Sequence, residues 1–429
     1  WLSATGTGDE KWPHRLAGRQ PMNTEEPSPP QNLPQDLPLS GIRVIELGHV
    51  VLGSSCGLIL ADMGAEVIKV EKAPDGDDTR RYSGFGSGLF HYFNRNKKSL
   101  TINLKEDDGK AVLRKAIQGA DVFIENFGPR TVERLGFGYE DCAALNPGLV
   151  YCSLKGFMPG PYENRPSLDN LVQMMGGLAY MTGPAGRPLR AGASVTDILA
   201  GTFGALGIIT ALYERRATGK GQNVVASLFE STAYLVAQHM SAAAVTGEDP
   251  PPMPEGENPW AIYDLFASAD GDQICIGVVS DRHWQQLCEV FEWTDLRRSS
   301  EFDTNDGRKQ NREYLLEQIQ DRLANLSCAE INARCEEAGL PFAPVRKPQD
   351  LFEDPHLLNS GGLLDTRLAD GRTVKLPRLP LRMGDHEFGM RLQAPAVGEG
   401  ARDYLAALGY DNTEIDRLVS DHTIVVPED

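Results

Sequence analysis

The stretch "GIRVIELGHVVLGSSCGLILADMGAEVIKVE" (41–71) constrains the fold more than any other part of the chain. It begins with a β-branched run at 41–47 and continues through a loop into an apolar helical segment across about 54–63. Gly64 ends that helix, and a second strand is expected at 66–70. Two strands joined by a helix form a βαβ unit, which belongs to a parallel sheet covered by helices.

The same alternation continues along the chain. "AVLRKAIQGADVFIENF" (111–127) predicts a helix and then a strand, and "GLVYCSLKGF" (148–157) predicts another strand. The first third of the chain is therefore expected to be α/β, with a doubly wound parallel sheet. The proline cluster "EDPPPMPEGENP" (248–259) reads as a linker to a smaller α+β domain. That domain is expected to hold two strands around an Asp-Gly turn, a helix at 281–291 and helical patterns at 307–326 and 328–338, and a last helix at 401–408 could pack back on the first unit.

Composition excludes several classes of protein. The formal net charge is −18, from 60 acidic and 42 basic residues, which argues against a nucleic-acid partner. The seven cysteines form no CxxC pair and no metal-ligand spacing, so we expect no disulfide framework, no metal and a reducing, cytoplasmic location. The apolar segment 201–212 is judged too short to span a membrane. Residues 1–38 are rich in proline and acid and are expected to form a disordered tail.

Two kinds of candidate residue follow the predicted strands. His49 sits just past the first strand, where open α/β sheets keep their ligand crevice, and a ligand role and a loop-capping role are equally compatible with its position. Basic residues also gather there, and they could form either a solvated surface or a phosphate pocket. They are Lys69, Lys72, Arg80, Arg81, Arg95, Lys97 and Lys98, and Arg130 and Arg134 follow the "FGP" turn. The GxGxxG fingerprint that a dinucleotide-binding domain carries after its first strand is absent from that position, which reads "GHVVLGSSCG".

Asp197 is the only charged residue between Arg190 and Glu214. It precedes an apolar helix expected to run to about residue 216, in which Gly201, Gly204 and Gly207 form a bare face for close packing. An aspartate at this place is a favoured N-cap. The other interpretation is a carboxylate that a substrate approaches and that the helix dipole keeps ionised. Local sequence leaves both interpretations open.

Several motifs together resemble the class III CoA-transferases, the CaiB–BaiF group. They are "PLSGIRVIELGHVVLGSSCGLILADMGAEVIKVEKAPDGDDTR", "NRNKKSLTINLKEDDGK", "ENFGPRTVERLGFGYE", "RRATGKGQNVVASLFE" and "EEAGLPFAPVRKPQDLFEDPHL", in the family's order from about Pro38 to the C-terminus. The resemblance implies a large Rossmann-like CoA-binding domain built from both chain ends, a smaller domain, and a homodimer of interlocked rings. The corresponding boundaries are 39–235 and 376–429 for the large domain, 260–350 for the small one, and linkers at 236–259 and 351–375.

The resemblance also implies the chemistry. Asp197 matches the family's catalytic aspartate, which forms an aspartyl anhydride with the acyl group and then an aspartyl-CoA thioester. Asp169 and Arg190 are expected to support the active site. Coenzyme A, as acyl-CoA, is expected as a substrate rather than as a permanently bound cofactor, and the second substrate is a carboxylic acid. The positions that match the family's CoA-binding residues are His49, Val50, Leu52, Lys72, Asn126, Phe127 and Arg134.

Two departures from relatives bear on the substrate. Where formyl-CoA transferases carry a run of glycines, this chain has "EGENPWAIY" (255–263), so an oxalate substrate is in doubt. Where α-methylacyl-CoA racemases carry a histidine, it has Leu168, and their second acid falls near Ser280, so a racemase or epimerase is a weaker alternative, beside a non-catalytic acyl-CoA-binding protein. Arg165, Arg187 and Arg190 either face solvent or pair with nearby acids, or they recognise a second carboxylate, as a succinyl donor would carry.

Overall fold

The computed structural model describes residues 37–256, 259–368 and 370–427. The expected disordered tail therefore lies outside the described residues except for its last two positions. The centre of the 255–263 segment, at Glu257 and Asn258, lies outside them too.

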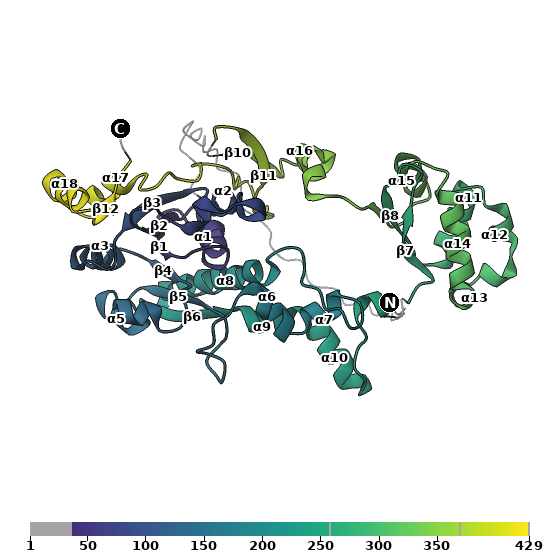
Figure 1. Ribbon diagram of the computed structural model, residues 1–429, viewed down its shortest axis with the longest axis horizontal. Helices are drawn as coiled ribbons and strands as arrows, with labels where there is room; N and C mark the ends of the chain where they lie inside the picture. The colour runs from purple at the N-terminus through teal and green to yellow at the C-terminus, as the bar shows by residue number, and fades with distance from the viewer. Residues whose placement is uncertain (1–36, 257–258, 369, 428–429) are drawn as a thin grey trace, which may run out of the picture. The chain divides into compact units, whose positions relative to one another are not determined.

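A seven-stranded sheet organises most of the described chain (Figure 1). Its order is β12-β3-β2-β1-β4-β5-β6, and all neighbours are parallel except β12, which runs antiparallel to β3. This confirms the predicted α/β class with a mainly parallel sheet. The strands are β1 (Arg43–Leu47), β2 (Glu66–Lys72), β3 (Lys97–Ile102), β4 (Val122–Glu125), β5 (Val150–Lys155), β6 (Gln222–Ser227) and β12 (Ile424–Val425).

The strand order reverses between β1 and β4. From β1 the chain proceeds through β2 to β3 on one side, whereas β4, β5 and β6 extend the sheet on the other. Val44 pairs with Val122, and Leu47 pairs with Glu125. In open α/β sheets, a ligand crevice forms outside the carboxyl ends of the strands at such a reversal. The loops after β1 and β4 are therefore the first place to look for a site.

Helices cover both faces of the sheet because successive strand residues point to opposite sides. Val44 and Val67 pack with α1 (Leu52–Asp62) and α8 (Val195–Thr218), whereas Ile45 and Ile68 pack with α3 (Asp107–Gln118) and α5 (Tyr139–Leu145). Figure 1 shows α1 and α8 on one side of the strands, with α3 and α5 on the other side. The C-terminal helices α17 (Ala401–Ala407) and α18 (Asn412–Ser420) join the α3 face. α18 and β12 were not anticipated from the sequence.

Helix α8 approaches its neighbours closely through glycine. A Cβ added at Gly201 would lie 2.1 Å from Ser55 Oγ of α1. At Gly204 it would lie 2.7 Å from Leu154 Cδ2 of β5, and at Gly207 it would lie 2.6 Å from Val224 Cγ1 of β6. The predicted bare face is therefore real, and it fixes α8 against both α1 and the sheet.

The expectation that the apolar segment of α8 is too short to span a membrane was wrong. α8 has 24 residues and a mean hydropathy of 1.7 over its most apolar window, so by length and composition it could cross a membrane. The expectation rested on the apolar run 201–212 alone, although the whole helix was expected to reach about residue 216. Buried helices of globular cores pass the same test, and α8 buries its glycine face against α1 and the strands.

The other helices of the sheet region are short, and several precede or follow α8. They are α2 (Leu89–Phe93), α4 (Thr131–Leu135), α6 (Asp169–Met175), α7 (Leu178–Thr182), α9 (Leu228–Leu235) and α10 (Ala237–Thr246), with 3₁₀ turns η1 (Asp78–Arg81), η2 (Gly84–Gly86) and η3 (Met253–Glu255).

Residues 260–344 form an antiparallel three-stranded sheet with helices on one face. Strands β7 and β8 flank the expected Asp-Gly turn, and Trp284, Leu315 and Ile331 are buried in a core of their own. The elements are β7 (Ile262–Ala267), β8 (Gln273–Val278), β9 (Phe342–Pro344), α11 (Asp281–Val290), α12 (Thr294–Arg298), η4 (Ser300–Phe302), α13 (Asn305–Gln310), α14 (Arg312–Leu323) and α15 (Cys328–Glu337). They are followed by η5 (Pro348–Glu353), α16 (Pro355–Asn359) and the hairpin of β10 (Leu363–Arg367) with β11 (Thr373–Pro377).

Candidate active site

Two cavities meet at the carboxyl ends of the strands. The larger has a volume of about 750 Å³ and is lined by residues that follow β1, β2 and β3. The smaller, of about 400 Å³, extends past β4 and β5 to the start of α8. His49, Val50 and Phe127 line both cavities. These three residues therefore form the boundary at which an elongated ligand would pass from one cavity to the other.

The loops after β1 and β4 hold each other in place. The backbone N–H of His49 donates to Asn126 Oδ1 at 2.9 Å, and Asn126 Nδ2 donates to the His49 carbonyl at 3.0 Å. The ring centroids of His49 and Phe127 lie 5.2 Å apart. The backbone of His49 thus ties two loops together, as the loop-capping interpretation expected, and the residue also lines both cavities.

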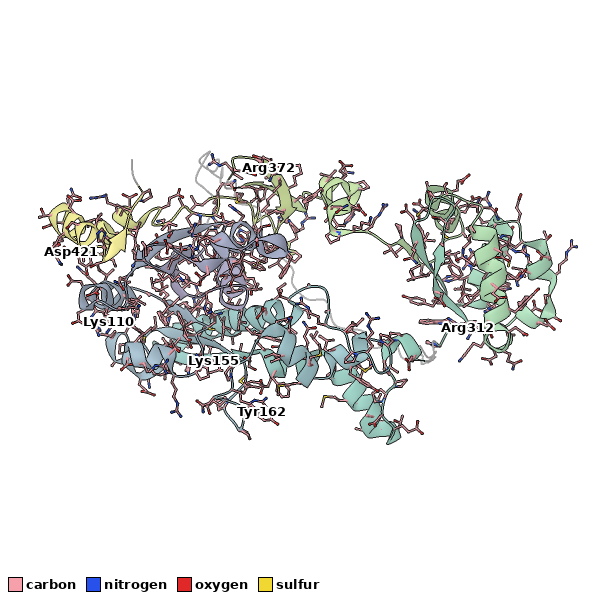
Figure 2. All side chains as sticks on the ribbon, in the orientation of Figure 1. Lys110, Lys155, Tyr162, Arg312, Arg372 and Asp421 are labelled. Atoms are coloured by element: carbon pink, nitrogen blue, oxygen red, sulfur yellow. The ribbon has the colours of Figure 1, made fainter. Side chains whose placement is uncertain are left out.

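A buried ion pair supports the Phe127 side of this boundary. Glu125 is fully buried at the end of β4 and accepts a hydrogen bond from the Phe127 N–H at 3.0 Å. Lys155, at the end of β5 and labelled in Figure 2, lies 2.6 Å from Glu125 Oε1 and donates to the Phe127 carbonyl at 3.2 Å. Lys155 also lines the smaller cavity. Lys155 was not among the candidates from the sequence, although its position at the end of a predicted strand pointed to it.

Asp197 lies in the wall of the smaller cavity and is not the N-cap of α8. The N-cap is Ser194, whose side chain makes no capping hydrogen bond. Asp169 of α6 caps the helix instead, because its Oδ1 accepts from the Thr196 N–H at 3.0 Å, from Thr196 Oγ1 at 2.5 Å and from the Asp197 N–H at 3.3 Å. The N-cap interpretation of Asp197 is therefore wrong, and its carboxyl group is left to face the cavity.

The surroundings of Asp197 make its carboxyl group basic. Burial, and to a lesser extent the neighbouring Asp169, raise its pKa to about 7, although Arg190 acts in the opposite direction. Asp169 is itself buried and accepts from Gln173 Nε2 at 2.6 Å. A carboxylate that is costly to ionise and open to a cavity is a candidate nucleophile.

The three candidate arginines have different positions. Arg165 lines the smaller cavity, with its guanidinium 5.0 Å from the ring centroid of Tyr162. Arg190 is held by Asn170 Oδ1 at 2.5 Å and by the Ala191 carbonyl at 2.9 Å, so its guanidinium is already engaged. Arg187 is exposed and is not among the residues that line either cavity.

Four members of the basic cluster fit neither a solvated surface nor a phosphate pocket, whereas Lys72 is exposed and lines the larger cavity. Lys69, Arg95 and Lys97 are buried and pair with Asp77, Asp62 and Glu46, at 3.0, 2.7 and 2.6 Å respectively. Arg80 pairs with Glu71 at 2.7 Å. The reason lies in the strand pattern: Lys69 and Lys97 belong to central strands whose two faces are both covered, so these charges needed buried partners.

Six of the seven proposed CoA-binding residues line a cavity. Lys72 reaches the larger one, where it pairs with Asp78 at 2.7 Å, and Leu52 and Asn126 line the smaller one. Arg134 does not line either cavity, since it is exposed and donates to Thr131 Oγ1 at 3.1 Å. Asn103 and Lys105, which follow β3, line the larger cavity and were missed.

Two further features restrict the chemistry. Leu168 lines the smaller cavity directly before Asp169, and its side chain cannot accept a proton from a substrate carbon. Within residues 37–256, 259–368 and 370–427, no group of three or more His, Cys, Asp or Glu side chains has the arrangement of a metal site.

Comparisons with known proteins identify the family. The model of CoA-transferase family III matches residues 39–401. The succinate–glutarate CoA-transferase of Agrobacterium fabrum is 32% identical over 86% of this chain and 96% of its own length. The acetyl-CoA:oxalate CoA-transferase of Acetobacter aceti is 34% identical over 76% of this chain and 87% of its own length.

Solved structures agree with the sequence comparison. A CaiB/BaiF family protein from Brucella suis superposes with a TM-score of 0.80, at 32% identity, covering 87% of this chain and all of that one. The chain belongs to CoA-transferase family III and is a CoA-transferase enzyme, as the motifs indicated.

Proposed function

We propose that this enzyme moves CoA from a dicarboxylic acyl-CoA, such as succinyl-CoA, to a carboxylic acid acceptor, with Asp197 as the nucleophile. The observation that carries the proposal is the Asp197 carboxyl group, which is released from capping α8 and lies in the wall of a cavity with its pKa raised to about 7. A carboxylate with a raised pKa is a better nucleophile than an ordinary one.

The two cavities suit the two ends of an acyl-CoA. The nucleotide would occupy the larger cavity, where Lys72 and Lys105 offer positive charge to phosphates. The pantetheine arm would run past His49, Val50 and Phe127, which line both cavities, and the thioester would reach Asp197 in the smaller cavity. Val51, Leu52 and Leu228 make part of that cavity apolar, which helps to exclude the water that would hydrolyse an anhydride.

The reaction would proceed through four acyl transfers. The Asp197 carboxylate attacks the thioester carbonyl, giving a mixed anhydride and CoA thiolate. The thiolate attacks the aspartyl carbonyl, which releases the donor acid and leaves an aspartyl-CoA thioester. The acceptor carboxylate attacks this thioester, which re-forms an anhydride and frees the thiolate. The thiolate then attacks the acceptor's acyl carbonyl, giving the new acyl-CoA and restoring the Asp197 carboxylate.

Arg165 supports the choice of a dicarboxylic substrate. Of the three candidate arginines, Arg165 is the one that lines the smaller cavity, and it forms no ion pair with a carboxylate among the described residues, so its guanidinium could receive the far carboxylate of a succinyl-like group. The relatives named above act on succinate, glutarate or oxalate by name, and all three are dicarboxylic acids.

A dimer is also proposed. Large apolar side chains are exposed on α6 to α10, among them Leu171, Leu206, Tyr213, Tyr234 and Met240. α9 contacts α6, α8 and α10, and large exposed apolar side chains on neighbouring helices are typical of a protein interface. We propose that a second copy covers it in the interlocked arrangement of the family, which light scattering after size exclusion would test.

We propose a cytoplasmic location as well. All seven cysteines lie in the described part of the chain and are free thiols, as a reducing compartment would keep them.

The experiment that tests the function is a CoA-exchange assay with succinyl-CoA and a panel of mono- and dicarboxylic acids, read by mass spectrometry. Exchange with dicarboxylic acids is expected. Arg165→Met should raise the KM for these acids about tenfold, and leave monocarboxylic acids unaffected. Arg187→Met, an arginine outside both cavities, is the matched control and should match wild type. Solvent deuterium incorporated at the α-carbon without any exchange would contradict the proposal and favour an epimerase.

A further inference from the structure

The larger cavity has a buried lysine behind its walls. Lys69 of β2 is fully buried, and its Nζ donates to the Gly48 carbonyl at 2.8 Å. The same ammonium group lies 3.0 Å from Asp77 Oδ2 and 3.3 Å from Glu46 Oε1. One charged group therefore contacts both the loop after β1 and the loop after β2.

These two loops form facing parts of the cavity wall. Gly48, His49 and Val50 line it from the β1 side, whereas Asp77, Asp78 and Tyr82 line it from the β2 side. Asp77 also shapes its own loop, because its Oδ1 accepts from the Thr79 N–H at 2.9 Å and from Thr79 Oγ1 at 2.7 Å, which caps η1. The contacts of Lys69 thus extend to both walls, although Lys69 itself lines neither cavity.

The loop after β1 needs such support because its backbone is strained. Val50 has φ = 57°, in the left-handed region, and a β-branched residue adopts that region rarely. A conformation of this kind is unfavourable and persists where surrounding contacts over-determine it. The Gly48 carbonyl bound by Lys69 and the His49 backbone bound by Asn126 are two such contacts on adjacent residues.

We propose that Lys69 is a positioning residue for CoA: its ammonium group sets the spacing of the two loops that face each other across the nucleotide cavity. The inference rests on the proposed function, because it assumes that CoA occupies this cavity. A residue that shapes a binding wall without touching the reacting atoms affects binding equally in the ground and transition states. Its loss should therefore raise KM and leave kcat largely unchanged.

The chain offers a matched control in Lys97 of β3. Lys97 is also fully buried and pairs with the other oxygen of Glu46, at 2.6 Å. Its remaining hydrogen bonds go to the Ser54 carbonyl at 3.0 Å and to Asn94 Oδ1 at 3.1 Å, neither of which lines either cavity. The two lysines are thus alike in burial and charge, and they differ in whether they hold the loops of the cavity wall.

The experiment compares Lys69→Met with Lys97→Met by calorimetric titration with CoA, by KM and kcat for acyl-CoA, and by thermal unfolding. Both variants should lower the melting temperature, because each removes one member of a buried ionic network. Lys69→Met should weaken CoA binding and raise the KM for acyl-CoA about tenfold, with kcat within about twofold of wild type. Lys97→Met should leave the Kd for CoA within about twofold.

Asp77→Asn tests the same contact between the two loops if Lys69→Met does not fold. It weakens the contact of Lys69 with one wall only, so an increase in the Kd for CoA smaller than that of Lys69→Met, about threefold, is expected. Unchanged CoA affinity in Lys69→Met or Asp77→Asn, or an equal loss in Lys97→Met, would overturn the inference. If the wild-type enzyme itself failed to bind CoA, the proposed function would fall first.

Discussion

The two cavities differ in what they do to the pKa of a buried carboxyl group: it is lowered for Asp77 in the larger cavity and raised for Asp197 in the smaller one. In the wall of the larger cavity, Asp77 lies beside the Lys69 ammonium group, and this pairing, with hydrogen bonds from Thr79, outweighs burial and lowers the pKa of Asp77 to about 2. In the smaller cavity, Asp197 has another carboxylate for a neighbour, and burial raises its pKa to about 7. The surroundings therefore stabilise the ionised form of Asp77 and disfavour that of Asp197.

The difference separates a structural carboxylate, Asp77, from a candidate nucleophile, Asp197. Removing either member of a buried ion pair leaves an uncompensated charge, so such pairs make a cavity wall resistant to change. A carboxylate that lacks this compensation keeps its basicity and can attack a substrate. The helix start shows how the second case is maintained, because Asp169 takes over the capping of α8 and Asp197 is left without that task.

The largest expected effect is the loss of turnover in Asp197→Asn. An amide cannot form the anhydride or the thioester, so kcat should fall by at least about 10⁴-fold. Asp403→Asn is the matched control, because Asp403 occupies the same first-turn position in α17 and is exposed. The CoA-exchange assay measures both variants. Substantial exchange by Asp197→Asn would remove the basis of the comparison.

A smaller effect is expected from Asp169→Asn. The substitution removes the negative charge that raises the pKa of Asp197, so the acid limb of the kcat/KM profile should move from about pH 7 to lower pH. It also weakens the cap that holds the start of α8, and we expect kcat to fall about 10- to 100-fold. A pH–rate profile between pH 5 and 9 separates the two consequences. An acid limb that stayed in place would show that Asp169 does not set the pKa of Asp197.

Asp77→Asn should act on stability instead. It leaves the buried Lys69 without its strongest anionic contact at this loop, and we expect a loss of about 3 kcal/mol in the free energy of unfolding at pH 7. Because the pKa of Asp77 is lowered from 3.8 to about 2 in the folded protein, its stabilising contribution is complete above pH 4 and is lost as the pH falls toward 2. Urea denaturation at pH 7 and pH 3 measures this, and the gap between wild type and variant should narrow at the lower pH.

The smallest expected effect is a gain in stability, in contrast to the loss expected for Asp77→Asn. The folded protein raises the pKa of Asp197 above its unfolded value of 3.8, so ionising this group costs stability as the pH rises toward 7. Asp197→Asn removes that cost, and relative to wild type it should gain about 2 kcal/mol between pH 5 and pH 8. Denaturation curves at both pH values test it. A variant less stable than wild type at pH 8 would mean that Asp197 is stabilised by its surroundings after all.

Periodic patterns predicted much of the fold. The runs around Val44, Val67 and Val150 identified strands of the parallel sheet, and the spacing of Gly201, Gly204 and Gly207 identified the packed face of α8. The two-residue strand β12 and helix α18 carried too little pattern to stand out, since β12 depends on pairing with β3 from the far end of the sequence.

The electrostatics were harder to foresee. Lys69 and Lys97 look like surface or ligand-binding charges in the sequence, because nothing local says that Glu46 and Asp77 will lie beside them. The capping of α8 by Asp169 was hidden for the same reason, since it joins residues of two different helices. Propensity alone favoured Asp197 as the cap, and only tertiary contacts reassign that role.

The most direct measurement is the intact mass of the enzyme after mixing with succinyl-CoA and a panel of other acyl-CoAs, beside Asp197→Asn treated in the same way. We predict a CoA-sized adduct on the wild-type chain that hydroxylamine removes, with none on the variant. Peptide mapping should place it on the segment that holds Asp197. No adduct with any donor while acyl-CoA still binds, or an equal adduct on Asp197→Asn, would contradict the assignment of Asp197 as the nucleophile.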